Sequence, residues 1–223
     1  MKGIIFMSSY IVKKSAVPVK LDAGWDSELW ANANEVKLDV TFDRNSDHTP
    51  DTRIKMLHDG KRICGLFQVK DRYVVARATA NQQQVCQDSC VEFYVKPCTD
   101  SRYFNFEINC GGTILLYHIT KCEPGGYDKI PESDLATIER FHTLPELITE
   151  EITEPVTWYL GFAIPISFFE KYSKIDPALS GQVWTCNFTK CADLCSHPSW
   201  LSWMPLSRCR FHLPDEFGKL IFE

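Results

Sequence analysis

The stretch DSCVEFYVKPCTDSRYFNFEINCGG, residues 88–112, contains two segments in which apolar side chains alternate with polar or amphipathic ones. The apolar members are Val91, Phe93, Val95, Phe104, Phe106 and Ile108, and the members between them are Cys90, Glu92, Tyr94, Asn105, Glu107 and Asn109. Successive side chains of a strand point to opposite faces of a sheet. The stretch therefore predicts two neighbouring strands with one face in a core.

The second face of these strands groups amides and carboxylates beside an aromatic side chain. Asn is depleted from strands, so placing both Asn105 and Asn109 there has a cost that ligand binding would explain. The alternative is solvent exposure, because half-exposed strands of antiparallel sheets carry polar residues on the wet side. We interpret the face around Glu92, Asn105, Glu107 and Asn109 as hydrogen-bonding groups for a polyhydroxylated ligand.

Length and charge narrow the class of protein. The chain of 223 residues suits one all-β domain, since such domains run to about 200–250 residues. A net charge of -5 without a basic stripe argues against a nucleic-acid partner. No apolar run approaches the roughly 18 residues of a membrane span. The opening MKGIIFM lacks the features of a signal peptide, which favours a cytoplasmic over a secreted protein.

Ten cysteines are too few for a disulfide scaffold in a chain of this length, so we expect reduced thiols. The segment KCADLCSH offers Cys191, Cys195 and His197 as zinc ligands, with Cys186 or Cys209 as a fourth. It lacks a second C-x-x-C pair, and unrelated thiols are the favoured interpretation. We therefore predict no metal site.

Short strands separated by Gly, Asp, Asn or Pro dominate the rest of the chain. The expected strands are 36–42, 53–58, 63–69, 73–79, 90–95, 103–109, 113–119, 158–165, 183–189 and 219–222. Helical turns are expected within 22–34 and 166–172. Without a βαβ rhythm this order predicts an all-β, two-sheet antiparallel β-sandwich, immunoglobulin-like or jelly-roll-like, with short peripheral helices. Residues 1–16 are expected to form an N-terminal tail and residues 17–223 a single domain.

A series of short motifs, in order along the chain, resembles the family 9 carbohydrate-binding modules and their DOMON-like relatives. The motifs are His58-Asp59, Val69-Lys70-Asp71, Asp88–Phe93, Tyr103–Gly112, Trp158–Pro165, Trp184–Lys190, Leu201–Pro205, Phe211-His212 and Phe217-Gly218. The resemblance extends from about residue 17 to residue 223. It implies a β-sandwich that binds sugars without catalysis, often as an accessory unit in carbohydrate catabolism.

The resemblance also implies how a sugar is held: between two aromatic planes, with carboxylate, amide and cationic groups on its hydroxyls. The carboxylate carries over to Glu92, and the polar face of the next strand to Asn105 and Glu107. The other candidates within the motifs and the predicted polar face are Asp88, Asn109 and Asn187. Arg77 and Lys190 are candidates for the cationic donor.

One aromatic plane of the family pattern falls near Val85 or Cys86, where this chain has no aromatic residue. Trp200, Trp203 or Tyr117 would have to replace it, and Trp203 is included among the candidate ligand-binding residues. Some members of the family bind structural calcium, for which this chain offers Asp43, Asn45 and Asp47. We favour a turn for those residues, and expect no cofactor apart from such a structural calcium ion.

Three other functions remain open. Glu92 and Glu107 on neighbouring strands resemble the carboxylate pair of a retaining glycoside hydrolase, although a sheet face seldom supplies the cleft and raised pKa that hydrolysis needs. Some DOMON-like relatives bind haem, for which Met56, His58, His118 and Met204 are available. Finally, a sandwich with a decayed sugar site would bind a protein partner of unspecified kind.

Overall fold

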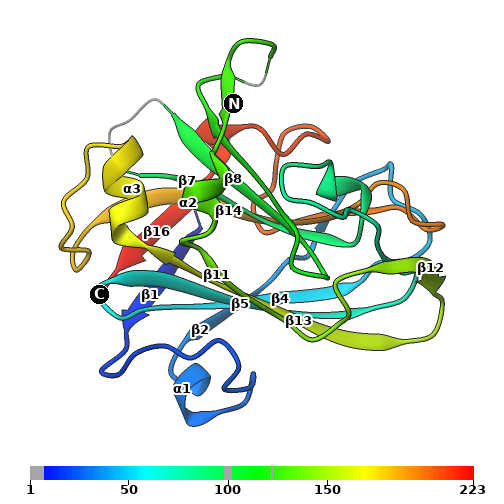
Figure 1. The fold of residues 1–223 in the computed structure, drawn as a ribbon, viewed down its shortest axis with the longest axis horizontal. Coiled ribbons are helices and arrows are strands. Elements are labelled where there is room, and N and C mark those ends of the chain that lie inside the picture. Colours follow the sequence, from blue (N-terminus) through cyan, green and yellow to red (C-terminus); the bar gives the residue numbers. More distant parts are fainter. Residues whose placement is uncertain (1–7, 98–101, 122) are drawn as a thin grey trace, which may run out of the picture.

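Two curved β-sheets pack face to face in the computed structural model (Figure 1), which describes residues 8–97, 102–121 and 123–223. The first layer contains β7 (Cys90–Lys96), β8 (Tyr103–Asn109) and β14 (Val183–Ala192), and the second contains β4 (Asp51–His58), β5 (Arg62–Asp71) and β13 (Val156–Pro165). This arrangement confirms the predicted β-sandwich. Among the described residues, no helix is long and apolar enough to cross a membrane.

The first sheet contains the two strands that residues 88–112 predict. Its order is β10 (Tyr127–Lys129), β9 (Ile114–Ile119), β8 (Tyr103–Asn109), β7 (Cys90–Lys96), β14 (Val183–Ala192) and β16 (Gly218–Phe222), and β15 (Ser199–Ser202) and β3 (Val40–Thr41) extend it beside β14. In the antiparallel β7–β8 pair, Glu92 lies opposite Glu107 and Tyr94 opposite Asn105. The predicted polar face is therefore one continuous surface.

The second sheet is built from longer strands. It consists of β4 (Asp51–His58), β5 (Arg62–Asp71), β13 (Val156–Pro165) and β11 (Glu139–His142), with β2 (Asn34–Lys37) beside β4, and β6 (Val74–Ala76) pairs separately with β12 (Ile148–Ile152). The helices are α1 (Glu28–Ala31), α2 (Glu132–Leu135) and α3 (Ile166–Tyr172), and 3-10 turns span Val85–Gln87 and Pro214–Glu216. Ser27 caps α1 by accepting a hydrogen bond from the Trp30 amide. Both predicted helical turns are present.

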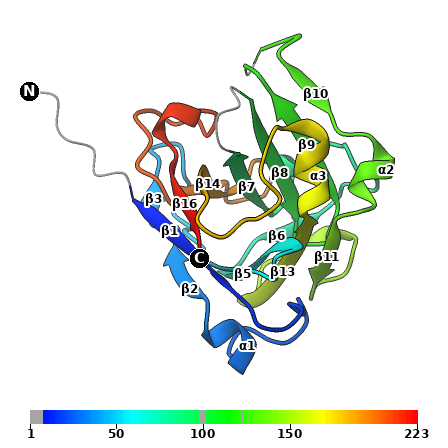
Figure 2. The same cartoon turned by 90° about the vertical axis from the view of Figure 1, so that its left-hand side faces the viewer.

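The N-terminal strand β1 (Ser9–Lys14) joins the two sheets. Its residues Ser9–Val12 pair in parallel with β16, and Lys13 and Lys14 pair in parallel with β4. Figure 2 shows β1 and β16 side by side. The predicted tail over residues 1–16 is thus wrong for residues 9–14, while residues 1–7 lie outside the described chain. Burial of Tyr10 and Val12, on either side of the exposed Ile11, explains why this short segment forms a strand.

Phe93 is the aromatic centre of the core between the sheets. Its ring centroid lies 5.9 Å from that of Phe106 and 5.6 Å from that of Phe188 in its own sheet. It also lies 5.4 Å from the Phe162 ring in the opposite sheet, at an interplanar angle of 16°. Gly65 leaves room for Phe162, because a Cβ there would overlap the ring. Since Phe93 points inward, its neighbours Glu92 and Tyr94 point to the outer face of the sheet.

We predict that Phe93→Ala destabilises the sandwich by about 3–5 kcal/mol, because it leaves a cavity among rings of both sheets. Denaturant unfolding measures this loss. Val17→Ala, at a side chain with 57% exposure, is the control and should change stability by less than about 0.5 kcal/mol. A loss below about 1 kcal/mol in Phe93→Ala would show that this stack does not hold the sheets together.

Candidate functional site

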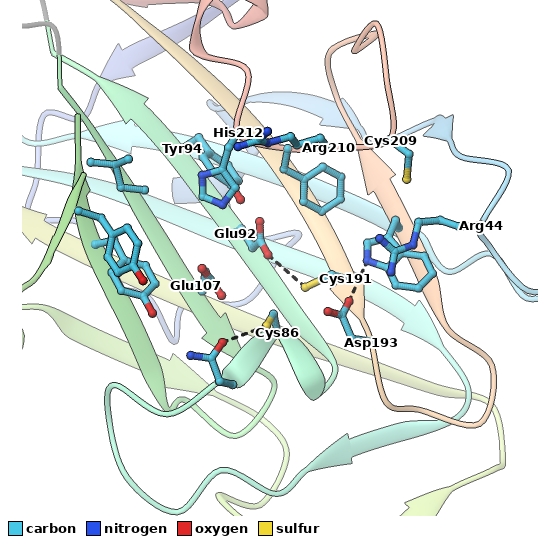
Figure 3. Close-up of a pocket in the computed structure, with 16 residues that line it drawn as sticks. Arg44, Cys86, Glu92, Tyr94, Glu107, Cys191, Asp193, Cys209, Arg210 and His212 are labelled. Atoms are coloured by element: carbon cyan, nitrogen blue, oxygen red, sulfur yellow. Dashed lines mark hydrogen bonds between the residues drawn. The ribbon is translucent and has the colours of Figure 1, made fainter. Parts of the chain in front are cut away.

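A cavity of about 330 Å³ lies over the outer face of the first sheet, on the side opposite Phe93. Its floor is formed by side chains of β7, β8 and β14, and its walls come from β9, β15 and the loops near residues 44, 86 and 210. Figure 3 shows Glu92 and Glu107 in the middle, with His212 and Arg210 on one side and Asp193 and Arg44 on another. The cavity thus forms over the predicted polar face.

Glu92 and Glu107 form the floor, and both are largely buried. Glu92 accepts hydrogen bonds from the Thr189 hydroxyl (2.7 Å) and from the Cys191 thiol (3.1 Å). Asn105 donates to Glu107 (2.6 Å) and to the Tyr94 hydroxyl (3.1 Å). Each carboxyl group is therefore held in one orientation, Glu92 by groups of the neighbouring strand β14 and Glu107 by a residue of its own strand.

Several titratable groups of the cavity have shifted pKa values, among them Glu92 and His212. Burial raises the pKa of Glu92, and the carboxylate of Asp193 adds to the shift, while hydrogen bonds from Thr189 and Cys191 oppose it. Burial, together with Arg210, lowers the pKa of His212 to about 4, and the Nδ1 of His212 lies 2.9 Å from the Tyr103 hydroxyl. His212 is consequently a neutral imidazole at neutral pH.

Trp200 on β15 forms one wall and is fixed by contacts with three residues. The Asn45 side chain donates to the Trp200 carbonyl (3.0 Å) and accepts from its amide (2.8 Å). The indole NH donates to Asp193 (2.8 Å), and the Arg44 guanidinium lies 3.5 Å from the ring centroid. Only 8% of Trp200 is exposed, so Arg44 covers much of the ring. The predicted turn is present here, since residues 43 and 44 form a turn and the Asn45 backbone amide donates to the Phe42 carbonyl (2.9 Å).

Tyr117 on β9 and Tyr127 on β10 form another wall, with ring centroids 5.1 Å apart in an edge-to-face arrangement. In the sheet order, β8, β7 and β14 separate β9 from β15. Tyr117 and Trp200 therefore lie on opposite sides of the carboxylate floor. Both were named from the sequence as replacements for the missing aromatic plane.

Cys86, at the position where the family pattern places an aromatic plane, lines the cavity from the 3-10 turn at Val85–Gln87. It is half-buried, and its sulfur lies 3.9 Å from the side-chain oxygen of Gln84. The residue that departs from the family pattern, Cys86, therefore lies in the wall of the cavity. A thiol there leaves a wider opening than an indole would.

Two predicted ligand-binding residues, Asn109 and Asp88, instead stabilise a turn. Asn109 is fully buried, donates to the Asp88 carboxylate (2.8 Å) and accepts from the amides of Gly111 and Thr113. Asp88 also accepts from the Ala78 amide (3.0 Å). Neither residue lines the cavity. The prediction that Asp88 and Asn109 bind ligand is therefore wrong. Their side-chain oxygens accept hydrogen bonds from buried backbone amides instead.

Asn187 and Lys190 on β14 are also buried beneath neighbouring segments rather than in the cavity. Asn187 donates to the Ser202 hydroxyl (2.9 Å) and accepts from two backbone amides. Lys190 donates to the Ser199 hydroxyl (2.8 Å) and lies 3.4 Å from Asp71. Both predictions of ligand binding are therefore wrong, because β15 supplies a partner for each side chain and β5 supplies a second one for Lys190.

Arg77 and Trp203 lie outside the cavity as well. Arg77 is exposed and donates to the backbone carbonyls of Thr149 and Leu194, both at 3.3 Å. Trp203 packs against Phe188 with ring centroids 5.4 Å apart and fills the space above Gly218. The prediction that these two residues bind ligand is therefore wrong. Arg77 holds a loop in place, and Trp203 packs on the core.

Sequence analysis missed two lining residues on strands β9 and β10, Ile119 and Tyr127, and a larger group on loops. The residues from loops are Arg44, Gln84, Asp193, Cys209, Arg210, Phe211 and His212. Phe211-His212 belongs to a family motif, and that was the one available signal. The other loop residues lie in segments without periodicity.

The sequence alternatives for metal and haem are not assembled among the described residues. Cys195 lies 3.6 Å from the Ser89 hydroxyl, while His197 stacks on Tyr73 with ring centroids 3.6 Å apart. His58 contacts the carbonyl of Glu223 (2.7 Å), and His118 stacks on a core phenylalanine. The residues of the zinc pattern and the candidate haem ligands therefore contact different neighbours and do not form a common site.

We predict that Glu92→Gln removes part of the pH dependence of stability. Because the pKa of Glu92 is raised by folding, its contribution to stability is full below about pH 4.3 and is lost as the pH rises through the folded value. Urea unfolding from about pH 4 to about pH 8 should show wild-type stability falling relative to Glu92→Gln. Glu150→Gln, on an exposed part of β12, is the control; parallel curves for wild type and Glu92→Gln would contradict the shift.

Comparisons with known proteins identify relatives of the same fold. A search of curated proteins finds no match. Among solved structures, a candidate carbohydrate-binding protein from Bacteroides uniformis ATCC 8492 shares 31% identity, with a TM-score of 0.86 over 97% of this chain and 100% of that one.

Two further matches are structures of a family 9 carbohydrate-binding module from Caldicellulosiruptor kristjanssonii. The complex with glucose has 10% identity and a TM-score of 0.63, and covers 97% of this chain and 96% of that one. The complex with cellotriose has 13% identity and a TM-score of 0.64, and covers 97% and 94%. They share the fold. The sequence model of carbohydrate-binding family 9 matches residues 27–222. The chain therefore belongs to carbohydrate-binding family 9, a family of non-catalytic carbohydrate-binding modules.

Proposed function

We propose that the cavity over β7, β8 and β14 binds the end of a carbohydrate chain. The observation that carries this proposal is the pair Glu92 and Glu107, held side by side between walls that contain Trp200 and Tyr117. Sugars have hydroxyl edges and apolar C–H faces, and a site for them needs both kinds of group.

The cavity contains polar groups that suit the hydroxyl groups of a sugar and an aromatic ring that suits its apolar face. Glu92 and Glu107 supply carboxyl oxygens as acceptors for hydroxyl groups, and the guanidinium groups of Arg44 and Arg210 line the same space as donors. Tyr117 offers a half-buried ring for the apolar face. Stacking on Trp200 requires the Arg44 side chain to move, because it covers that ring.

Size favours a chain end over a long polymer segment. The volume of about 330 Å³ is near the lower limit of small-molecule pockets, roughly 300–1,000 Å³. One or two sugar units suit such a space. The module from Caldicellulosiruptor kristjanssonii holds glucose or cellotriose, so glucose and cello-oligosaccharides are the first ligands to test.

Binding without catalysis is part of the proposal for this chain. Hydrogen bonds from Thr189 and Cys191 hold Glu92, and one from Asn105 holds Glu107. Carboxyl groups restrained by hydrogen bonds within the sheet suit recognition, in keeping with the non-catalytic family. We further propose that neither nucleic acid nor membrane is a partner, in line with the net charge of -5.

We predict that Glu107→Gln and Tyr117→Ala each weaken sugar binding at least tenfold, about 1.4 kcal/mol, because one loses a charged acceptor and the other a stacking ring. Calorimetric titration against mono- and oligosaccharides, with reducing and reduced ends compared, measures this. Tyr159→Ala is the matched control, since Tyr159 is a half-buried tyrosine on β13 of the other sheet. Thermal melting checks that each variant is folded.

Heat with one sugar class, lost in both cavity variants and kept in Tyr159→Ala, supports the proposal. Equal weakening in all three variants would place binding elsewhere. If no saccharide of the panel gives a heat of binding, the alternative that the domain binds a protein partner would be favoured. Turnover of chromogenic glycosides that disappears in Glu107→Gln would contradict binding without catalysis.

A further inference from the structure

Two buried thiols and one carboxyl group meet at the floor of the cavity. Cys90 on β7 lies directly opposite Cys191 on β14, and Glu92 follows on the same face of β7. The sulfur atoms of both cysteines and a carboxyl oxygen of Glu92 lie within 4.8 Å of one another. This is a different set from the KCADLCSH pattern, of which it uses Cys191 alone.

The spacing is close to that of a zinc centre. Zn–S bonds of about 2.3 Å and Zn–O bonds of about 2.1 Å in a tetrahedron place ligand atoms roughly 3.5–3.8 Å apart. Cys191 already donates to Glu92 at 3.1 Å. Only a small rearrangement of side chains is therefore needed to bring three ligand atoms around one ion.

The cavity gives direct access to two of the three groups. Glu92 and Cys191 line it, whereas Cys90 is fully buried behind them. An ion could enter from the cavity and keep its fourth coordination position on that side. A closed structural site would offer no such position.

We propose that Cys90, Cys191 and Glu92 bind a thiophilic divalent cation of the Zn²⁺ class, with water as the fourth ligand. Binding breaks two S–H bonds and forms two metal–sulfur bonds. The two thiol protons go to solvent, while the Glu92 carboxylate adds one oxygen and no oxidant or reductant takes part. Two sulfur ligands disfavour Ca²⁺ and Mg²⁺, which prefer oxygen.

The thiols are protonated while the site is empty. Burial raises the pKa of Cys90 to about 12, and a hydrogen bond with Cys90 together with burial raises the pKa of Cys191. Metal binding must compete with these protons. Affinity should accordingly increase as the pH rises.

Cobalt is a suitable spectroscopic probe, because thiolate ligation gives Co²⁺ a charge-transfer absorption that carboxylates alone do not. Fully reduced wild-type protein should develop this absorption to about one equivalent, and Zn²⁺ should abolish it. Cys90→Ala and Cys191→Ala should each weaken Co²⁺ binding at least tenfold. Cys209→Ala, which removes an exposed thiol that also lines the cavity, should leave the absorption unchanged.

A second measurement needs no variant. Wild-type protein is titrated with Zn²⁺ in weak buffer, and the protons released into solution are counted. The proposal predicts that the first equivalent of Zn²⁺ releases the thiol protons and that later equivalents release none. An absorption that survives Cys90→Ala and Cys191→Ala, or is lost in Cys209→Ala, would overturn it. So would the absence of both absorption and proton release, or a Cys90–Cys191 disulfide that persists under reductant.

Discussion

The position of Phe93 between the two sheets is the constraint on which the cavity depends. Its ring stacks between Phe106 and Phe188 of one sheet and Phe162 of the other. Because a strand alternates, burying Phe93 inward forces both of its neighbours outward. A slip of one residue would exchange the core and the cavity floor. The packing of the core therefore also sets the direction of Glu92 and Tyr94.

The same alternation buries two carboxyl groups at the floor of the cavity, and this burial costs free energy of folding. Buried carboxyl groups opposite each other are tolerated only when each has partners, and the hydroxyl of Thr189, the thiol of Cys191 and the amide of Asn105 provide them. These partners fix the carboxyl oxygens before a ligand arrives. Prior orientation reduces the entropy that binding must offset, which suits a module that recognises without reacting.

The alternation of apolar and polar residues in the sequence correctly predicted strands and the faces that their side chains take. Residues 88–112 predicted two strands and their faces, and Glu92 and Glu107 line the cavity as a result. It failed for Asn187, which lies on the cavity side of β14 but is covered by β15 and the segment that follows it. It also failed for Lys190, which lies on the core side of β14 opposite Val91 and reaches Asp71 of the second sheet. Alternation shows which face a side chain takes; it does not show whether a later strand or loop covers that face. The walls around Arg44 and His212 come from loops, which have no period to detect.

The central claim is that a sugar binds over β7, β8 and β14. Nuclear magnetic resonance of isotope-labelled protein, titrated with the saccharide panel, tests it most directly, because every backbone amide reports at once. The account predicts shifts grouped around Glu92, Glu107, Tyr117 and Trp200, with β4, β5 and β13 unaffected. Shifts grouped on the second sheet, or a spectrum unchanged by every saccharide, would contradict it.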